Sequence, residues 1–136
     1  MDGQDCVIEA KAARRQGRLM DATALYVEAA ESFLAEHEPA RWAHALRHAA
    51  ELAVRSGDCA AALREAHAVV EYYRSSPPTT LEMANALRVA ALAEAAVGEA
   101  DSARKHWDEA RTLYGDAGVA DGVAEASRRV AALASA

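Results

Sequence analysis

The sequence is short of aromatic side chains and of the residues that interrupt regular structure. Phe, Trp and Tyr together make 5% of its 136 residues, and it has three prolines, seven glycines and two cysteines. Strands are enriched in aromatic and β-branched residues, whereas alanine, which fills more than a quarter of this sequence, is the best helix former. We therefore expect an all-α protein with closely packed helices, and its length suits a single domain over residues 1–136.

Three further absences exclude classes of protein. The two cysteines, Cys6 and Cys59, form no CxxC pair, which argues against a disulfide framework or a zinc site and favours a reducing compartment. No apolar run near 18 residues and no signal-peptide pattern occurs, so we expect a cytoplasmic protein with no membrane attachment. The 15 basic residues are dispersed within a net charge of −6, which argues against nucleic acid as a partner.

An internal repeat organises the chain. Gly17, Gly57 and Gly98 are spaced 40 and 41 residues apart. Each glycine is followed by an alanine five residues later and by an aromatic residue sixteen residues later. These residues are Ala22, Ala62 and Ala103, and Phe33, Tyr73 and Tyr114. A fixed period between about 20 and 50 residues predicts stacked helix-turn-helix units.

Apolar residues at helical spacing and capping residues between them predict seven helices. We place them at about 5–16, 19–36, 41–56, 59–74, 81–97, 101–114 and 119–133. Asp5 and Asp58 are expected caps, Thr79 with Glu82 forms a capping box, and Pro39 suits the first turn of the third helix. The GDAG segment at 115–118 is expected to be a loop.

Equivalent positions of the units carry a characteristic set of residues. A small residue stands midway along the first helix, a glycine lies near the turn, and an alanine, an aromatic residue and a second alanine follow along the second helix. The small residues are Ala10, Ala50, Ala91 and Ala132, and the second-helix sets are Ala22, Tyr26 and Ala29, then Ala62, Ala66 and Val69, then Ala103, Trp107 and Ala110. This set resembles the tetratricopeptide repeat. The middle unit departs from the family pattern at Ala66 and Val69.

The resemblance implies a right-handed α-solenoid of about three tetratricopeptide-like helix-turn-helix repeats and a C-terminal capping helix. The repeats span about 4–38, 41–76 and 80–116, and the capping helix about 119–134. The period of 40–41 residues exceeds the ~34 residues usual in the family, and longer helices of the kinesin-light-chain-like variety would explain the difference. A plain antiparallel helical bundle is the alternative fold.

In this family the first helix of each repeat lines a concave groove, so the resemblance implies a noncatalytic module that binds a peptide or protein segment. Arg47, Arg88 and Arg129 share one repeat position, 41 residues apart, and form the predicted binding site together with His44 and Asn85. Guanidinium groups bind carboxylates through paired hydrogen bonds, and similar grooves in the family hold acidic C-terminal tails. We therefore expect an acidic or carboxylate-ended ligand.

Several alternatives stay open. The arginines could instead solvate an exposed face and pair with nearby acids. The chain could self-associate into a homodimer through exposed faces of its terminal repeats. His44 and His48, one turn apart in HALRH, have the spacing of two metal ligands, but no carboxylate or cysteine completes a motif, so neither a metal nor another cofactor is expected. No phosphate-binding glycine loop or catalytic motif occurs, and we expect no enzyme.

Overall fold

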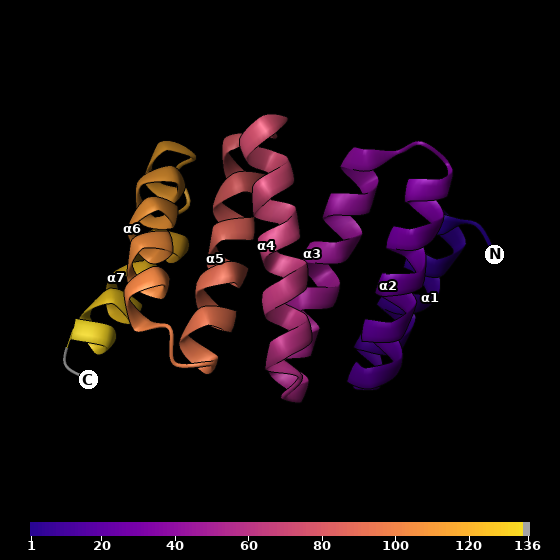
Figure 1. Cartoon of the computed structure of the whole chain (residues 1–136), viewed down its shortest axis with the longest axis horizontal. Coiled ribbons are helices and arrows are strands. Elements are labelled where there is room, and N and C mark those ends of the chain that lie inside the picture. The colour runs from indigo at the N-terminus through magenta and orange to yellow at the C-terminus, as the bar shows by residue number, and fades with distance from the viewer. Residues whose placement is uncertain (135–136) are drawn as a thin grey trace. The chain divides into compact units, whose positions relative to one another are not determined.

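A computed structural model describes residues 1–134 of the chain. These residues form seven α-helices and no strand (Figure 1). The helices are α1 Gly3–Arg15, α2 Leu19–Ala35, α3 Pro39–Ser56, α4 Cys59–Ser75, α5 Thr80–Ala96, α6 Ala100–Asp116 and α7 Ala120–Ala134. The predicted all-α fold of seven helices is thereby confirmed. None of the helices in this part of the chain is both long enough and apolar enough to cross a bilayer.

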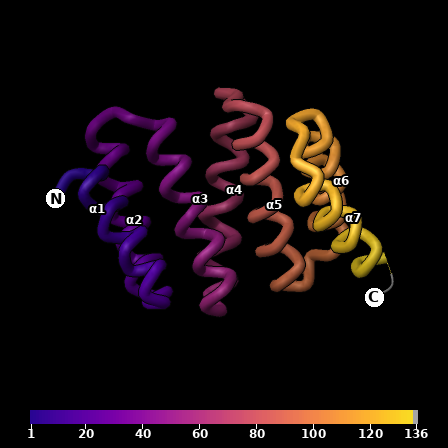
Figure 2. Tube along the Cα trace, turned by 180° about the vertical axis from the view of Figure 1, so that it is seen from behind, coloured from indigo at the N-terminus to yellow at the C-terminus, as the bar shows by residue number. Residues whose placement is uncertain are grey.

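The chain groups into two compact units, Met1–Glu65 and Ala66–Ala136. The boundary between them along the sequence falls within α4. In the first unit, α2 packs against both α1 and α3 (Figure 1). In the second unit, α6 packs against both α5 and α7 (Figure 2). Consecutive helices joined by short turns thus pack as predicted, while the single domain and the right-handed superhelical path stay predictions.

Most of the predicted helix ends are confirmed. Gly57 ends α3 in the left-handed conformation with a φ of +91°, which glycine adopts without a Cβ penalty. Pro39 opens α3, where the missing N–H costs no helical hydrogen bond. Thr79 caps α5, because its hydroxyl oxygen accepts a hydrogen bond from the backbone N–H of Glu82 at 3.2 Å.

Two predicted helix ends are wrong. Asp2, not Asp5, caps α1: the backbone N–H of Asp5 donates to Oδ1 of Asp2 at 2.8 Å. The helix α6 continues through Gly115, which we placed in a loop, and the left-handed turn falls at Gly118 with a φ of +76°. A glycine inside a helix costs only about 1 kcal/mol relative to alanine, so Gly115 does not end α6.

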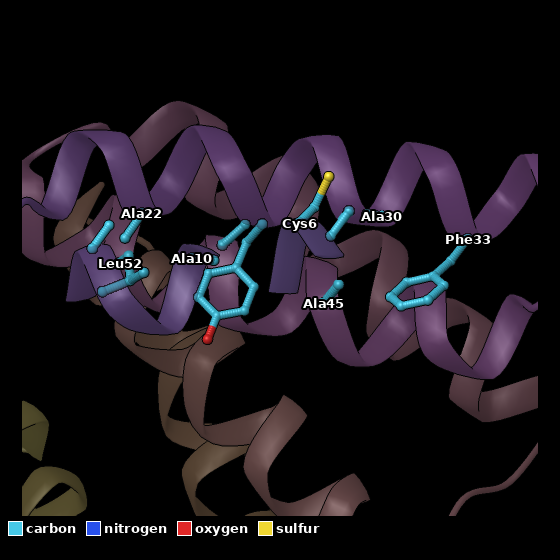
Figure 3. Close-up of a cluster of buried hydrophobic side chains, with 11 residues drawn as sticks. Cys6, Ala10, Ala22, Ala30, Phe33, Ala45 and Leu52 are labelled. Atoms are coloured by element: carbon cyan, nitrogen blue, oxygen red, sulfur yellow. The ribbon is translucent and has the colours of Figure 1, made fainter. Parts of the chain in front are cut away.

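Alanine side chains line the contacts among α1, α2 and α3 (Figure 3). The buried cluster consists of Cys6, Ala10, Ala13, Ala22, Tyr26, Ala29, Ala30, Phe33, Ala45, Ala49 and Leu52. These helices contribute few large apolar side chains to the cluster. They therefore bury their surfaces by approaching one another closely, which short side chains allow. Leu34 is 56% exposed, because it lies about 100° around the helix from the buried Phe33.

The core of the second unit has one large side chain at its centre. Trp107 of α6 is 1% exposed and is surrounded by small buried residues and partly buried aliphatic ones. These are Ala91, Ala103 and Ala126, with Leu92, Val130 and Leu133. The last helix, α7, also fits closely on α6: a Cβ added at Gly122 would come within 2.4 Å of the Tyr114 ring. Only glycine leaves room for that ring.

We expect Gly122→Ala to lower the free energy of unfolding by about 1–3 kcal/mol, the usual effect of overpacking a filled core. Gly115→Ala is the matched control, because a Cβ there would come no closer than 3.9 Å to Val123 and alanine raises helix propensity by up to about 1 kcal/mol. Urea denaturation followed by circular dichroism measures both variants. Equal stabilities would contradict the close packing of α7 on Tyr114.

Candidate functional site

The three arginines predicted to share one site are distributed over the two units. Arg47 of α3 belongs to the first unit, whereas Arg88 of α5 and Arg129 of α7 belong to the second. Arg47 is buried, with 8% of its surface exposed, although we expected it to line an accessible groove. The surroundings of each arginine therefore decide what it can bind.

Arg88 has an internal carboxylate partner. Its Nε and Nη2 donate to the two oxygens of Glu125 on α7, at 2.5 and 3.3 Å. This is the paired geometry in which a guanidinium holds a carboxylate. The hydrogen bond from Arg88 holds the pKa of Glu125 below its usual range. Arg88 thus pairs with a nearby acid, as the alternative interpretation of the arginines proposed.

Two other predicted binding residues of the second unit also have internal contacts. Nη2 of Arg129 lies 3.7 Å from Oε2 of Glu125, and its guanidinium carbon lies 5.9 Å from the centre of the Trp107 ring. Asn85 accepts a hydrogen bond on Oδ1 from the hydroxyl of Tyr114 at 2.7 Å. A ligand at this place would have to compete with contacts within the unit.

Arg47 differs from Arg88 although the repeat makes the two equivalent. Its Nε is buried and has no hydrogen-bond partner among the described residues. Leaving a buried donor without a partner costs about 1–3 kcal/mol, and more for a charged group.

His48, next to Arg47 on α3, lies among aromatic and basic side chains. Its ring stacks on Tyr26 with centroids 5.1 Å apart and 17° between the planes. Nη1 of Arg14 lies 3.4 Å from its Nδ1, and its Nε2 lies 3.3 Å from Nε2 of His44. A guanidinium only donates, so Nδ1 of His48 accepts. We therefore assign the proton of the neutral ring to Nε2, which donates to His44.

This hydrogen-bond pattern argues against the metal site considered for the HALRH motif. A histidine ligand offers an unprotonated nitrogen to the ion. In His48, however, Nε2 carries the proton and Nδ1 accepts from Arg14. The charge of Arg14 would also repel a cation. Over residues 1–134, the structure contains no group of three or more His, Cys, Asp or Glu side chains that could hold a metal ion.

The surroundings of His48 are electropositive. Burial lowers the pKa of His48 to about 3, and the charges of Arg47, His44, Arg14 and Lys11 act in the same direction. The ring is therefore neutral at physiological pH. The groups that act on it are all basic, and they come from both α1 and α3.

A buried carboxylate in the second unit was not anticipated from the sequence. Glu94 of α5 is 2% exposed. Its Oε2 lies 2.9 Å from Nε2 of His67, and its Oε1 lies 2.7 Å from Nδ1 of His106. An imidazole nitrogen that carries a proton can donate to a carboxylate oxygen, and each histidine is within hydrogen-bond distance of one oxygen of Glu94. Glu94 thereby links α4, α5 and α6 at one point.

The sequence does contain a signal for Glu94, because this acid interrupts an otherwise apolar run in α5. Its partners are not recognisable in the same way. His67 and His106 are 27 and 12 residues away, on other helices, and no spacing rule connects them to Glu94. A search for polar residues on buried helix faces would have found the carboxylate alone.

Two further titratable groups have shifted pKa values. Burial raises the pKa of Glu65 to about 7, and its Oε2 is buried without a hydrogen-bond partner among the described residues. Burial, together with the charge of Glu28, raises the pKa of the Cys6 thiol. A thiol with a raised pKa is a poor nucleophile at neutral pH, so Cys6 is a packing residue.

Comparisons with protein-family models and with curated proteins found no match to the chain. Membership of the tetratricopeptide family therefore stays a prediction from the repeated residues. The function of the chain is inferred from its own side chains and their contacts.

The lowered pKa of His48 predicts that the folded chain loses stability in acid. Its pKa is about 3 in the folded chain and about 6.5 in an unfolded chain, so the unfolded state binds more protons between these values. The free energy of unfolding therefore falls as the pH drops from about 6.5 to 3, by at most about 1.4 kcal/mol per pH unit. The variant His48→Gln removes this slope.

His37→Gln is the control, because it replaces an exposed imidazole in the same unit. Glu65 contributes the opposite slope: its stabilisation is complete below about pH 4.5 and is lost as the pH rises through about 7. All variants retain Glu65, so its contribution cancels in the comparison. Guanidinium denaturation over a pH series measures the slopes. The same slope for wild type and His48→Gln would contradict the assignment.

Proposed function

We propose that the chain is a noncatalytic interaction module of tetratricopeptide-like repeats that binds an acidic or carboxylate-ended peptide or protein segment. The observation that supports this proposal best is the guanidinium of Arg47, whose Nε is buried without a partner in the first unit. A carboxylate from a ligand would supply the missing acceptor. The general chemistry is that of a guanidinium and a carboxylate joined by charge-assisted hydrogen bonds.

The second unit provides an internal comparison for this chemistry. Arg88 stands at the same repeat position, and its Nε and Nη2 donate to the two oxygens of Glu125. Nε of Arg47 has no such acceptor among the described residues. A peptide carboxylate at Arg47 would therefore do for the first unit what Glu125 does for the second. His44, exposed on α3 one turn before His48, is a neighbouring contact in this proposal.

We expect a library of random peptides with free carboxyl ends, selected on the immobilised chain, to yield binders enriched in acidic residues or dependent on the terminal carboxylate. Arg47→Gln should weaken their binding at least about tenfold, because one charge-assisted hydrogen bond contributes about 1.5–3 kcal/mol. Isothermal titration calorimetry with the selected peptides measures the loss. Circular dichroism establishes that the variant is folded.

Arg55→Gln is the matched control. Arg55 lies on α3 and is exposed, so the substitution removes the same charge from the same helix without touching Arg47. We expect wild-type affinity for this variant. Peptides that bind wild type, Arg47→Gln and Arg55→Gln equally well would sink the proposal.

Self-association is a second candidate, supported by large apolar side chains on the outside of the first unit. Ile8 on α1 is 56% exposed, and Met20 and Leu34 on α2 are 79% and 56% exposed. Exposed apolar side chains of this size are candidates for burial in an interface. They would support a homodimer through the first repeat.

Size-exclusion chromatography with light scattering distinguishes the two candidates. The peptide-binding proposal predicts the mass of one chain at every concentration. A dimer in the wild type that dissociates in Ile8→Glu would favour self-association instead. Gln4→Glu is the control, because it adds the same charge at another exposed position of α1 and should leave the mass unchanged.

A further inference from the structure

The helix α2 carries a row of apolar side chains that its own unit leaves largely uncovered. Met20, Val27 and Leu34 follow one another at intervals of seven residues, so they lie within about 40° of one another around the helix axis. Met20 is 79% exposed, Leu34 is 56% exposed and Val27 is half-buried. The buried rings of Tyr26 and Phe33 lie about 100–120° from Val27 around the same helix. The outer row of α2, formed by Met20, Val27 and Leu34, is therefore on a different face from the rings that fill the core.

The repeat provides an internal comparison for the outer row. The equivalent positions, 40 and 81 residues further along the chain, all carry small, polar or charged residues and are exposed or half-buried. They are Ala60, His67 and Arg74 on α4, and Asp101, Asp108 and Gly115 on α6. Packing within a repeat thus does not require a large apolar residue at these positions, and it does not account for Met20 and Leu34. Large apolar side chains that remain exposed together are candidates for an interface.

The seven-residue spacing of the outer row suits a second helix. Apolar residues repeated at i, i+7 and i+14 form one seam of the packing between two helices that lie side by side. The row extends over about 21 Å, since the chain rises about 1.5 Å per residue from Met20 to Leu34. Ala24 lies between Met20 and Val27 and is exposed, and its short side chain leaves room for a neighbouring backbone. The face therefore fits an amphipathic helix of about four turns, held through apolar anchors at matching positions.

The charged residues beside the outer row have one sign. The helix α2 contains Asp21, Glu28 and Glu31 and no basic residue. Glu28 and Glu31 lie on the same side of the row, at about 100° and 40° from Val27. Both are exposed, and neither forms an ion pair with another described residue, whereas Asp21 pairs with Arg18 at 3.1 Å. Two exposed carboxylates that are not neutralised within the unit thus border the apolar row.

These charges distinguish between two occupants of the face. In an antiparallel, two-fold pair of α2 helices, the acidic borders of both copies would lie on the same side of the pair and repel each other. Each copy also has a net charge of −6. A helix with lysine or arginine beside its apolar face would instead place cations opposite Glu28 and Glu31, and such complementarity favours one partner over another. The charges therefore favour a basic partner helix over a second copy of the chain.

We propose that the outer row of α2 is a docking surface for an amphipathic helix of a partner protein whose apolar face is flanked by basic residues. The apolar side chains of that helix pack on the outer row, and its basic side chains pair with Glu28 and Glu31. This surface lies on α2, whereas the proposed carboxylate ligand binds at Arg47 on α3. Binding of the helix therefore does not depend on the carboxylate proposed for Arg47.

Three synthetic peptides of about three heptads each test this proposal. The first has leucine at one position of every heptad, lysine at the two flanking positions and alanine elsewhere. The second has glutamate in place of lysine, and the third has glutamine in place of leucine. Each is added to the wild-type chain labelled with ¹³C at its methionine methyl groups, at an ionic strength of about 0.01 M, where exposed charges act over about 30 Å. Met20 reports on the surface, and Met83 on α5 is the internal reference.

We expect the leucine–lysine peptide to shift the methyl resonance of Met20 and to leave that of Met83 unchanged. Its affinity should exceed that of the glutamate peptide at least about tenfold, because two exposed ion pairs replace two like-charge contacts. The glutamine peptide should bind at least about tenfold more weakly than the leucine–lysine peptide, since it lacks the apolar anchors. Met20→Gln and Leu34→Gln, both at exposed positions, should each weaken the leucine–lysine peptide about tenfold.

Charge reversal separates this contact from the general attraction of a basic peptide to an acidic protein. Glu31→Lys should weaken the leucine–lysine peptide and strengthen the glutamate peptide, each at least about threefold. Glu71→Lys is the matched control, because Glu71 is exposed on α4 at the repeat position equivalent to Glu31. It makes the same change in net charge and should alter neither affinity.

A Met20 methyl resonance that does not move with the leucine–lysine peptide would overturn the docking surface, as would equal affinities of Glu31→Lys and Glu71→Lys. Equal affinities for the lysine and glutamate peptides would overturn the basic partner. A wild type that is a dimer by light scattering, and a monomer as Met20→Gln, would assign the surface to a second copy instead. Arg47→Gln should bind the leucine–lysine peptide as the wild type does, so a failure at either proposed surface is distinguishable from a failure at the other.

Discussion

The close approach of neighbouring helices through alanine is the constraint on which the rest of the structure depends. Ala10, Ala22 and Ala49 have no exposed surface, and contacts between such short side chains leave little room for larger ones. Each large residue therefore needs its own opening in a neighbouring helix. The repeated aromatic position shows this directly, because the ring of Phe33 lies against Gly3 and that of Tyr114 against Gly122, where a Cβ would come within 2.5 and 2.4 Å.

Local features of the sequence explain which parts of the fold were predicted well. Helix positions depend on local periodicity and capping, and both are visible in a single sequence, so all seven helices were predicted. The errors occurred where two residues could do the same task. Asp2 and Asp5 are both good caps, and only the hydrogen bond to Oδ1 of Asp2 selects one. Gly115 and Gly118 could both end α6, and the backbone adopts a positive φ only at Gly118.

The candidate site was less predictable because its properties depend on contacts distant in the sequence. The repeat made Arg47 and Arg88 equivalent. It could not show that Glu125, 37 residues after Arg88, would accept hydrogen bonds from both Nε and Nη2 of Arg88. Glu94 is a second example, since its two imidazole partners come from other helices. Repeats predict which positions correspond, whereas the side chain that satisfies a charge is specific to each unit.

The two units also differ in how their buried charged side chains are hydrogen-bonded. In the second unit, the buried Glu94 has both oxygens hydrogen-bonded, and Arg88 has Glu125. In the first unit, Arg47 is 8% exposed and its Nε has no acceptor among the described residues. A leucine or glutamine in its place would remove this buried donor, whose missing hydrogen bond costs about 1–3 kcal/mol. An anion that binds only the folded chain would offset this cost by mass action, so the unpartnered Nε of Arg47 is the feature on which the proposed ligand depends.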